Sequence, residues 1–342
     1  MTPGARLAAA VDVLEDVVKR HRPIATALAD WGKAHRFAGS GDRAMIGNIV
    51  YDAMRQRRSA AARMQADTPR ALVLGVAAGA LGRSPAEVAA LCDGAGHALG
   101  PLTEAETHAL MASSHTQTAA DTNPGISGDI PDWLVPHLTA AFGPDRVVEE
   151  GRAFAARAPL DVRVNTLKAT REKVLDALSH TGASPTPWSP VGVRVPAASG
   201  SRRLPKVEAE AAHGRGWFEV QDESSQIAAC LAGAGPREQV LDLCAGAGGK
   251  TLALGAAMQN TGQIHAYDRD KMQLRPIFDR LKRADLRNVQ TIDGGDAKAL
   301  DALGDRFDLV FVDAPCSGSG TWRRRPDAKW RLTAKQLGAR IK

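Results

Sequence analysis

The chain has 342 residues, of which 44% are hydrophobic, and it carries a formal net charge of +6. This length and composition exclude a small disulfide-stapled peptide and a disordered chain, and they predict a globular protein with several domains. The longest apolar run, residues 71–81, is too short to cross a bilayer, so we expect a cytoplasmic protein without a membrane segment.

The four cysteines form no Cys-x-x-Cys pair, and the nine histidines show no ligand spacing. We therefore expect neither a disulfide framework nor a metal site. The positive charge favours polyanionic partners, because a basic surface releases counterions when it binds nucleic acid. Charge alone does not distinguish a nucleic-acid-binding protein from an ordinary basic protein.

The first part of the chain, residues 1–122, is rich in alanine and predicts a helical bundle. Apolar residues recur at helical spacing from Leu7 to Val18, and a second helix with a wider apolar stripe begins near Asp42. Residues 113–128 are polar and contain glycine and proline, a composition typical of an exposed connector. We place a domain boundary there.

The next segment, residues 131–225, predicts a small α+β domain. Apolar residues up to Phe142 suggest a helix, and residues 161–168 alternate between apolar and polar side chains. In that stretch Val162 and Val164 share one face, which predicts a half-buried strand with a polar face.

The last segment, residues 226–342, predicts an α/β domain. A pattern of strand, glycine turn and helix repeats along it, and the predicted strands are residues 239–243, 263–267, 289–292 and 308–312. Alternating βα units imply a parallel, doubly wound sheet that binds its ligand at the carboxyl ends of the strands.

The first turn of this domain has the sequence DLCAGAGGKT, at residues 242–251. Its glycines let the backbone turn tightly and approach a ligand, and the helix that follows presents free N–H groups. Asp268, at the end of the second strand, is placed to accept both ribose hydroxyls of a nucleoside. This pattern is typical of an adenosine-cofactor site.

Three other interpretations of this turn remain open. A phosphate-binding P-loop would share the Gly-Lys-Thr ending, but Cys244 stands where its first glycine belongs. A dinucleotide site would space its glycines differently. The glycines could also serve only the packing of a helix on the sheet, although the acidic residues at the neighbouring strand ends argue against that.

A second loop, DAPCSGSGT at residues 313–321, follows the fourth predicted strand and places an acid and a thiol beside the expected crevice. Cys316 could instead be a small buried hydrophobic residue. Residues 322–331 then interleave five cations with two tryptophans. Such a segment can grip phosphates and stack RNA bases, or it can be a solvated loop whose tryptophans turn inward.

Taken together, these segments resemble the RsmB/Sun/Nop-type family of RNA cytosine-5 methyltransferases, which use S-adenosylmethionine. Both loops match the family, except that Ala247 replaces a proline, and residues 163–168, 216–225 and 324–327 match its other recurring segments. The early helices are similar to the NusB-like RNA-binding domain of the RsmB branch. The resemblance implies a NusB-like bundle, a small α+β domain and a Rossmann-like methyltransferase domain with an incomplete parallel sheet.

The resemblance also implies roles for individual residues. The residues implied to bind the cofactor are Cys244, Ala245, Gly246, Ala247, Gly248, Gly249, Lys250, Asp268, Asp296 and Asp313. Catalytic roles are implied for Cys316 and Asp313, and RNA contacts for Arg163, Lys168, Arg323, Arg324 and Arg325. The implied partner is RNA, with ribosomal RNA favoured and transfer RNA possible, and we expect a monomer without a metal.

The chemistry of this family needs thiols, because carbon 5 of cytosine is a poor nucleophile until a thiolate adds to carbon 6. In the family the attacking thiol comes from a later Thr-Cys-Ser-like segment, while the cysteine matching Cys316 releases the product. No cysteine stands between Cys316 and the last residue, Lys342. We therefore expect a truncated enzyme whose main nucleophile lies downstream of Lys342. The alternatives are a non-catalytic RNA- or cofactor-binding remnant and a P-loop NTPase.

Overall fold

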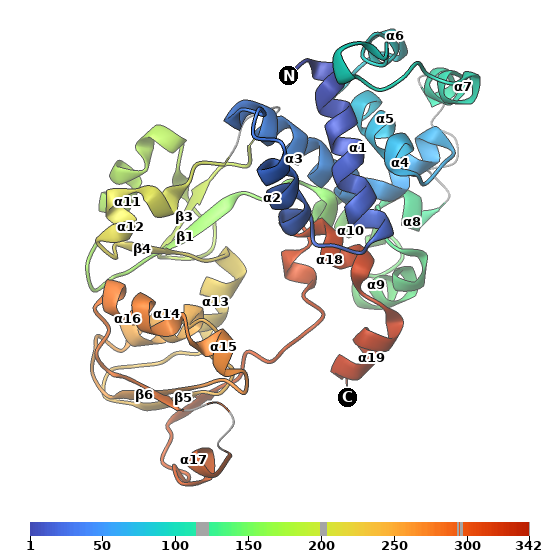
Figure 1. Ribbon diagram of the computed structural model, residues 1–342. Helices are drawn as coiled ribbons and strands as arrows, with labels where there is room; N and C mark the ends of the chain where they lie inside the picture. Colours follow the sequence, from blue (N-terminus) through green and yellow to red (C-terminus); the bar gives the residue numbers. More distant parts are fainter. Residues whose placement is uncertain (114–122, 199–203, 293, 295–296, 342) are drawn as a thin grey trace. The chain divides into compact units, whose positions relative to one another are not determined.

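A computed structural model describes residues 1–113, 123–198, 204–292, 294 and 297–341 (Figure 1). The described residues form two compact units. One, here called the helical unit, consists mainly of Met1–Ala158 and the described residues from Cys316 onward. The other, the sheet unit, consists of the described residues of Pro159–Ala197 and Leu204–Pro315. The three predicted domains are thus distributed over two units, and their boundaries stay a prediction.

The helical unit contains no strand among its described residues. Its helices are α1 (Pro3–Lys19), α2 (Ile24–Ala34), α3 (Ser40–Arg55), α4 (Arg57–Met64), α5 (Pro69–Ala78), α6 (Pro85–Ala90), α7 (Glu104–Ser113), α8 (Pro124–Ser127), α9 (Val135–Phe142), α10 (Val147–Ala155), α18 (Pro326–Arg331) and α19 (Ala334–Ile341). Short 3-10 helices cover Ala95–His97, Asp132–Leu134 and Ser319–Thr321. The predicted amino-terminal bundle is confirmed.

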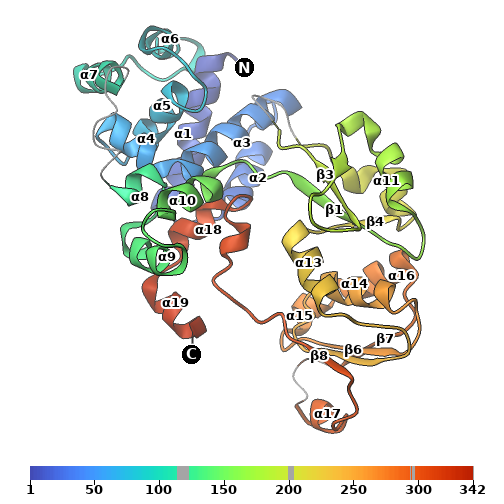
Figure 2. The same cartoon turned by 180° about the vertical axis from the view of Figure 1, so that it is seen from behind.

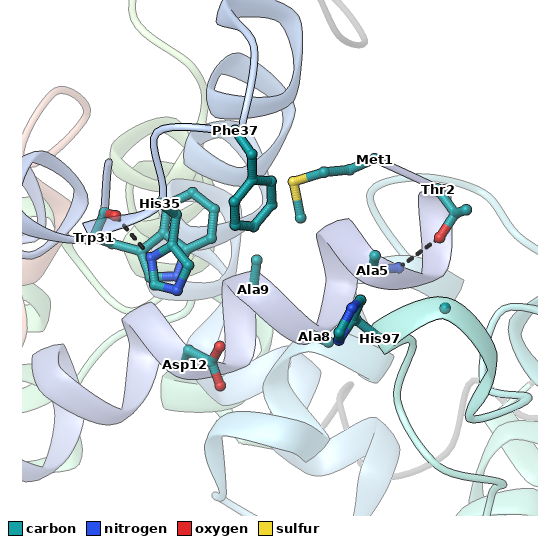
Figure 3. Close-up of a pocket in the computed structure, with 11 residues that line it drawn as sticks. Met1, Thr2, Ala5, Ala8, Ala9, Asp12, Trp31, His35, Phe37 and His97 are labelled. Atoms are coloured by element: carbon teal, nitrogen blue, oxygen red, sulfur yellow. Dashed lines mark hydrogen bonds between the residues drawn. The ribbon is translucent and has the colours of Figure 1, made fainter. Parts of the chain in front are cut away.

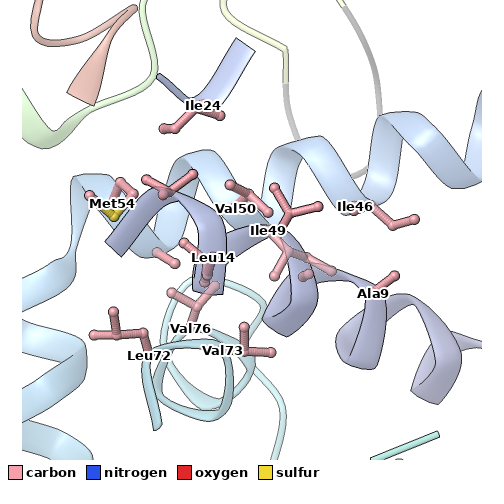
Figure 4. Packing of buried hydrophobic residues seen from close by; sticks show 14 of the residues in the cluster. Ala9, Leu14, Ile24, Ile46, Ile49, Val50, Met54, Leu72, Val73 and Val76 are labelled. Atoms are coloured by element: carbon pink, nitrogen blue, oxygen red, sulfur yellow. The ribbon is translucent and has the colours of Figure 1, made fainter. Parts of the chain in front are cut away.

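Helices α1, α3 and α5 meet in the core of this unit (Figure 4). The second predicted helix is α3, whose apolar stripe is buried as expected. The stripe of α1 lies slightly differently from the prediction: Leu7 and Leu14 are buried, whereas Val11 and Val18 are only partly buried. The buried face turns toward Val13 and Val17 because small alanines at neighbouring positions let α3 and α5 approach.

The carboxyl-terminal segment of the chain packs within the helical unit. Trp322 is 2% exposed and lies in a cluster with Leu134, Leu138 and Val147. Trp330 donates its indole N–H to the backbone carbonyl of Met54 at 2.6 Å. The structure therefore contradicts the interpretation of both tryptophans as base-stacking platforms, because their rings are used for packing.

The sheet unit contains two four-stranded sheets. The first is antiparallel, with the order β2-β3-β1-β4, and its strands are β1 (Leu160–Val164), β2 (Ser184–Pro185), β3 (Gly192–Val195) and β4 (Phe218–Val220). Helices α11 (Arg171–Ala177) and α12 (Ala211–Gly214) accompany it, as do 3-10 helices at Ser179–Thr181 and Val207–Ala209. The small α+β domain expected in the middle of the chain is present.

Strand β1 departs from the prediction in one respect. Its apolar residues Val162 and Val164 are buried as expected, but Asp161 and Arg163 on the other face are buried too. Asp161 is held by Arg194 in a two-bond ion pair of 2.7 and 2.8 Å. The expected solvent-exposed polar face is wrong, because the polar side chains find buried partners.

The second sheet is parallel, with the order β7-β6-β5-β8. Its strands are β5 (Gln239–Asp242), β6 (Gln263–Tyr267), β7 (Val289–Ile292) and β8 (Leu309–Phe311), close to the four predicted ranges. Its helices are α13 (Glu223–Leu231), α14 (Gly249–Ala257), α15 (Lys271–Leu274), α16 (Ile277–Ala284) and α17 (Ala297–Asp301). Helices α13, α14 and α16 lie over one face of the sheet (Figures 1 and 2).

The order of the parallel strands defines where a ligand would bind. From β5 the chain proceeds outward to β6 and β7 and then returns to place β8 on the other side of β5. This reversal creates a topological switch point between β5 and β8, and ligands of doubly wound sheets bind at the carboxyl ends of the strands there. Both special loops of the sequence begin at those two strand ends.

Membrane spans and metal clusters are both absent from the described residues. Within them, no helix is both long and apolar enough to cross a membrane. Nor does any group of three or more His, Cys, Asp or Glu side chains in that part of the chain form a candidate metal site.

Candidate functional site

The turn between β5 and α14 depends on two glycines with positive φ. Gly246 has φ +52° and Gly248 has φ +81°, a region that side chains rarely adopt. A Cβ atom on Gly248 would lie 2.4 Å from Cγ1 of Ile277, which is fully buried in α16. Glycine is therefore required at position 248 both for conformation and for the close approach of the turn to α16.

Asp268 closes this turn from the end of β6. Its Oδ2 accepts the backbone N–H of Gly246 at 2.9 Å, and its Oδ1 accepts the N–H of Asp270 at 2.8 Å. The N–H of Ala245 donates to the carbonyl of Tyr267 at 2.9 Å, which ties the same two segments by their backbones. The structure thus brings the predicted ribose-binding carboxylate against the predicted cofactor turn.

Asp242, the last residue of β5, lies beneath the turn and is fully buried. Its Oδ2 accepts a hydrogen bond of 2.7 Å from the hydroxyl of Thr251, while its Oδ1 is buried without a partner in the structure. Burial raises the pKa of Asp242, the hydrogen bond from Thr251 lowers it and the charge of Asp313 raises it, and together these bring it to about 6. An unpaired buried carboxylate oxygen points to a site that a polar or cationic ligand would complete.

Lys250 and Asp313 meet across the switch point. The Nζ atom of Lys250, in the first turn of α14, lies 2.5 Å from Oδ2 of Asp313, which follows β8. Lys250 is largely buried, whereas Asp313 is half exposed. Two residues predicted to share the cofactor site are therefore in contact, and Asp313 presents its free carboxylate oxygen to solvent.

The negative charges of three carboxylates act on the thiol of Cys244, the third residue of the turn. Burial raises the pKa of the Cys244 thiol, and the charges of Asp268, Asp242 and Asp313 raise it further. The thiol is therefore held in its neutral form, which argues against a role for Cys244 as a nucleophile. The acidic surroundings favour a ligand that brings positive charge to this end of the sheet.

Cys316 is exposed and belongs to the helical unit, since the division between the two units follows Pro315. Its Sγ accepts the N–H of Gly318 at 3.5 Å, and its backbone carbonyl accepts a bond of 2.8 Å from Arg340 of α19. The alternative of a buried, inert cysteine is wrong. The structure presents this thiol to solvent on a loop whose backbone is fixed at one point.

The residues predicted to contact RNA are divided between the two units. Arg163 is 4% exposed and donates from Nη1 to the Gly249 carbonyl and to Oε1 of Gln221, at 2.7 and 2.6 Å. The prediction that Arg163 contacts RNA is wrong for this structure, because a buried guanidinium cannot reach a phosphate. Lys168 is half-buried and donates to the carbonyl of Arg283 at 3.2 Å.

The other three predicted RNA contacts belong to the helical unit. Arg323 is half-buried and donates to the backbone carbonyl of Arg157 at 2.9 Å, and Arg324 is half-buried as well. Arg325 is exposed. Of these three predicted residues, Arg325 has the side chain most accessible to an RNA backbone.

Two positions that the prediction names lie outside the described residues. One is Asp296, which the resemblance places near adenine. The other is Lys342, the last residue of the sequence, downstream of which we expect the main nucleophile. The structure tests neither expectation, and both stay predictions. Among the described residues, the exposed thiols are those of Cys230 and Cys316.

The prediction from sequence missed three residues that contact the turn or its supports. Arg280 of α16 donates to the Ala247 carbonyl at 2.8 Å and pairs with Glu219 of β4, and Gln221 holds Arg163. Glu219 and Gln221 lie in the segment 216–225 that matched the family, which was the available signal. Nothing in the local sequence distinguishes Arg280 from the other cations of its helix.

A cavity of about 650 Å³ lies in the helical unit and contains none of the predicted site residues. Trp31 and His35 stack there with ring centroids 4.3 Å apart, and Figure 3 shows Phe37 beside Met1. Burial raises the pKa of Asp12, which also lines it. Since no nucleophile or acid–base pair of the predicted chemistry lies there, we place the candidate site at the turn of the parallel sheet.

Comparison with known proteins identifies two matching family models. Residues 229–341 match the model described as 16S rRNA methyltransferase RsmB/F, and residues 130–200 match an RsmF/B-like ferredoxin-like domain. A protein named "Probable ribosomal RNA small subunit methyltransferase B" from Synechocystis is 31% identical over 213 residues, which are 61% of this chain and 46% of that protein. "Ribosomal RNA small subunit methyltransferase B" of Escherichia coli O17:K52:H18 is 34% identical over 58% of this chain and 45% of its own length.

Solved structures show the same fold. PH0851 matches 99% of this chain and 80% of its own with a TM-score of 0.67 at 22% identity. NSun6 from Pyrococcus horikoshii, solved with SFG, covers 62% of this chain and 76% of its own with a TM-score of 0.54 at 21% identity. A methyltransferase homolog from the same organism covers 60% and 65%, with a TM-score of 0.51 at 26% identity.

The parallel sheet, its switch point and the glycine turn are those of a Rossmann-like methyltransferase. More narrowly, residues 229–341 and 130–200, which together make up about half of the chain, match models of the RsmB/F methyltransferase family. The chain spans about half the length of the curated relatives that it matches. The NusB-like identity of the first helices stays a prediction.

Proposed function

We propose that this chain is part of an S-adenosylmethionine-dependent enzyme that methylates carbon 5 of cytosine in small-subunit ribosomal RNA. The names of its relatives support the ribosomal substrate and, with it, a cytoplasmic location. The observation that carries the proposal is the glycine turn with three carboxylates, from Asp242, Asp268 and Asp313, acting on Cys244. A cofactor with a positively charged sulfur suits such a site.

The residues present fit this cofactor. When bound, S-adenosylmethionine supplies an electrophilic methyl group on a sulfonium centre. Residues 244–250 would hold its methionine and ribose portions, with the backbone brought close by Gly248. Each oxygen of Asp268 accepts one backbone N–H, which orients the carboxylate and leaves lone pairs for the two ribose hydroxyls. The role of Asp296 near adenine stays a prediction from the resemblance.

The same geometry disfavours a P-loop NTPase. A phosphate site needs free backbone N–H groups and a lysine directed at the phosphates. Here the N–H of Gly246 is taken by the carboxylate of Asp268, and Lys250 is paired with Asp313. Carboxylates that surround the turn would repel a triphosphate, whereas they attract a cation.

Calorimetry with S-adenosylmethionine and, separately, with ATP tests the cofactor. We expect binding of S-adenosylmethionine that weakens about tenfold or more in Asp268→Asn, since a charge-assisted hydrogen bond is lost. Asp270→Asn is the matched control, because Asp270 carries the same charge two residues away and caps α15 without touching the turn. Binding of ATP alone would refute the methyltransferase proposal and favour the NTPase.

Within this proposal Cys316 releases the product, as the resemblance implies, and in a variant of the proposal Cys316 itself attacks carbon 6 of the cytosine. RNA containing 5-fluorocytosine tests the role, because fluorine at carbon 5 cannot be removed as a proton and a thiol adduct at carbon 6 therefore persists. If Cys316 attacks carbon 6, an adduct forms in the wild type and in Cys230→Ala, whose cysteine is also exposed, but not in Cys316→Ala. An adduct that survives in Cys316→Ala would assign attack to another thiol and leave product release to Cys316.

A methyl-transfer assay with labelled cofactor and 16S ribosomal RNA distinguishes the enzyme from the non-catalytic alternative. The enzyme interpretation predicts transfer to carbon 5 of a cytosine once the family's Thr-Cys-Ser-like segment is supplied. Binding of both cofactor and RNA without transfer would instead describe a binding protein.

A further inference from the structure

Two backbone carbonyls of the glycine turn are held by arginines. The carbonyl of Ala247 accepts from Nη1 of Arg280 at 2.8 Å, and the carbonyl of Gly249 accepts from Nη1 of Arg163 at 2.7 Å. Because a trans peptide unit is planar, fixing a carbonyl also fixes the direction of the next N–H. The arginines therefore set the orientation of the N–H groups of Gly248 and Lys250.

These two N–H groups have different roles in the turn. The N–H of Gly248 donates to the carbonyl of Ala245 at 2.8 Å and closes the turn. The N–H of Lys250 lies in the first turn of α14, where a helix provides no carbonyl partner. Arg280 thus supports the closure of the turn, and Arg163 supports the direction of an N–H at the start of the helix.

Arg163 comes from the antiparallel sheet rather than from the methyltransferase fold. It lies on β1, its second bond from Nη1 goes to Gln221, and its Nε is buried without a partner in the structure. Burial lowers the pKa of Arg163 to about 10, so the side chain is charged at neutral pH. Burying a guanidinium costs desolvation free energy, and the hydrogen bond to the Gly249 carbonyl offsets part of that cost while it fixes this carbonyl.

Arg280 is held in turn by the same antiparallel sheet. Glu219 of β4 has a side chain only 5% exposed, and its Oε2 lies 3.1 Å from Nη2 of Arg280. Its other oxygen, Oε1, lies 2.6 Å from Nη2 of Arg283. Glu219 therefore fixes two arginines of α16, of which Arg280 also bonds to the turn.

We propose that Arg163 and Arg280 are positioning residues for the cofactor turn, and that Glu219 sets the position of Arg280. The antiparallel sheet, which the resemblance linked to RNA through Arg163, thereby becomes part of the cofactor site. This inference rests on the proposed function, because the ligand of the turn is taken to be S-adenosylmethionine.

Arg283 provides a matched control. Like Arg280 it is on α16, is about one-fifth exposed and pairs with Glu219, but the hydrogen bonds of its side chain go to Glu219 rather than to the turn. Arg280→Gln and Arg283→Gln each remove one cation from Glu219. Only the first also removes the bond to the Ala247 carbonyl.

The experiment compares these variants in the full chain by calorimetry with S-adenosylmethionine and by thermal unfolding. Arg280→Gln should raise the Kd about tenfold, whereas Arg283→Gln should change it less than about threefold, although both lose similar stability. Arg280→Lys, which keeps the charge facing Glu219, should recover part of the affinity. Equal changes of Kd in the Arg280→Gln and Arg283→Gln variants would overturn the inference.

Hydrogen exchange of the backbone N–H groups of residues 244–251 gives a readout that needs no cofactor. These groups should exchange faster in Arg280→Gln and in Arg163→Gln than in Arg283→Gln. Equal exchange in all three variants would refute the positioning role. If the variants differ in exchange as expected but the wild type binds no S-adenosylmethionine, the proposed cofactor is refuted and the positioning role stands.

Discussion

The ammonium of Lys329 donates a hydrogen bond of 2.6 Å to the backbone carbonyl of Asp129, although the two residues are 200 positions apart. Lys329 is 1% exposed, and its Nζ also lies 4.9 Å from the ring of Trp330. Asp129 in turn accepts two bonds from Ser59 through its carboxylate. The contact fixes α18, and with it the segment that follows Cys316, to the core of the helical unit.

Replacing Lys329 should change how stability depends on pH. Burial lowers the pKa of Lys329 from 10.5 to about 8. Between these values the unfolded chain binds a proton that the folded chain has lost, so the free energy of unfolding should rise with pH by as much as about 3 kcal/mol. Lys329→Met should remove this rise.

Urea unfolding at pH 7, 8, 9 and 10 measures the effect as a difference between the wild type and the variant. Taking the difference cancels the contributions of other lysines and of tyrosines. Parallel pH profiles for the two proteins would show that Lys329 titrates normally and would contradict the prediction.

Trp322 should contribute strongly to the stability of the helical unit. Its ring is 2% exposed and packs against Phe154 with centroids 5.3 Å apart. Trp322→Ala should lower the free energy of unfolding by about 3–5 kcal/mol, because the change leaves a cavity. Trp188 is 78% exposed, so Trp188→Ala should change stability by no more than about 0.5 kcal/mol. Similar losses in both variants, measured by thermal or urea unfolding, would contradict the packing described here.

The parallel sheet could be predicted from sequence because its signals are local. Each strand is a short apolar run followed by glycine or aspartate, so the ranges of β5 through β8 and the positions of Asp242 and Asp268 followed from neighbouring residues. The order of the strands then placed Asp313 at the switch point by the general rule for doubly wound sheets. The contact between Lys250 and Asp313 is consistent with that rule.

The burial of Arg163 and of the tryptophans could not be predicted in this way. A cation in a strand indicates a solvent face unless the partner is known, and the partner of Arg163 is a carbonyl 86 positions later. In the same way, the bond of Trp330 joins it to Met54, 276 positions earlier. Alternation and charge describe a side chain's preference for water, whereas these contacts depend on which segments the whole fold brings together.

Gly248 and Gly246 should respond differently to alanine. Both have positive φ, so either substitution adds strain of about 1–3 kcal/mol. At Gly248 the new methyl group would also lie 2.4 Å from buried Ile277, whereas at Gly246 the nearest atom is Oδ2 of Asp268 at 4.0 Å. Gly248→Ala should abolish binding of S-adenosylmethionine, and Gly246→Ala should weaken it.

A double-mutant cycle with Ile277→Ala identifies the clash as the cause. Removing the isoleucine side chain should cost less stability in the Gly248→Ala background than in the wild type, since it relieves the contact. Additive losses in unfolding experiments would attribute the effect of Gly248→Ala to backbone conformation alone.

The affinity for S-adenosylmethionine should increase as the pH rises through about 6. Burial raises the pKa of Asp242 to about 6, so the carboxylate is protonated in the free protein at pH 5 and ionised at pH 7. A sulfonium cation favours the ionised form, and binding to that form alone would be about tenfold weaker at pH 5 than at pH 7. The α-amino group of the ligand titrates near pH 8 and so changes little in this range.

Asp242→Asn should flatten this profile, which calorimetry between pH 5 and 7 would measure. The same variant has a second expected effect. Between pH 3.8 and about 6 the folded wild type keeps a proton on Asp242 that the unfolded chain has lost, so the free energy of unfolding of the wild type falls as the pH rises through this range. In Asp242→Asn that loss, about 3 kcal/mol in the wild type, should be absent. Asp270→Asn, whose carboxylate caps α15 without touching the turn, is the control and should keep the pH profile of the wild type. A profile that persists in Asp242→Asn would assign the titration to another group and remove Asp242 from the binding of the cation.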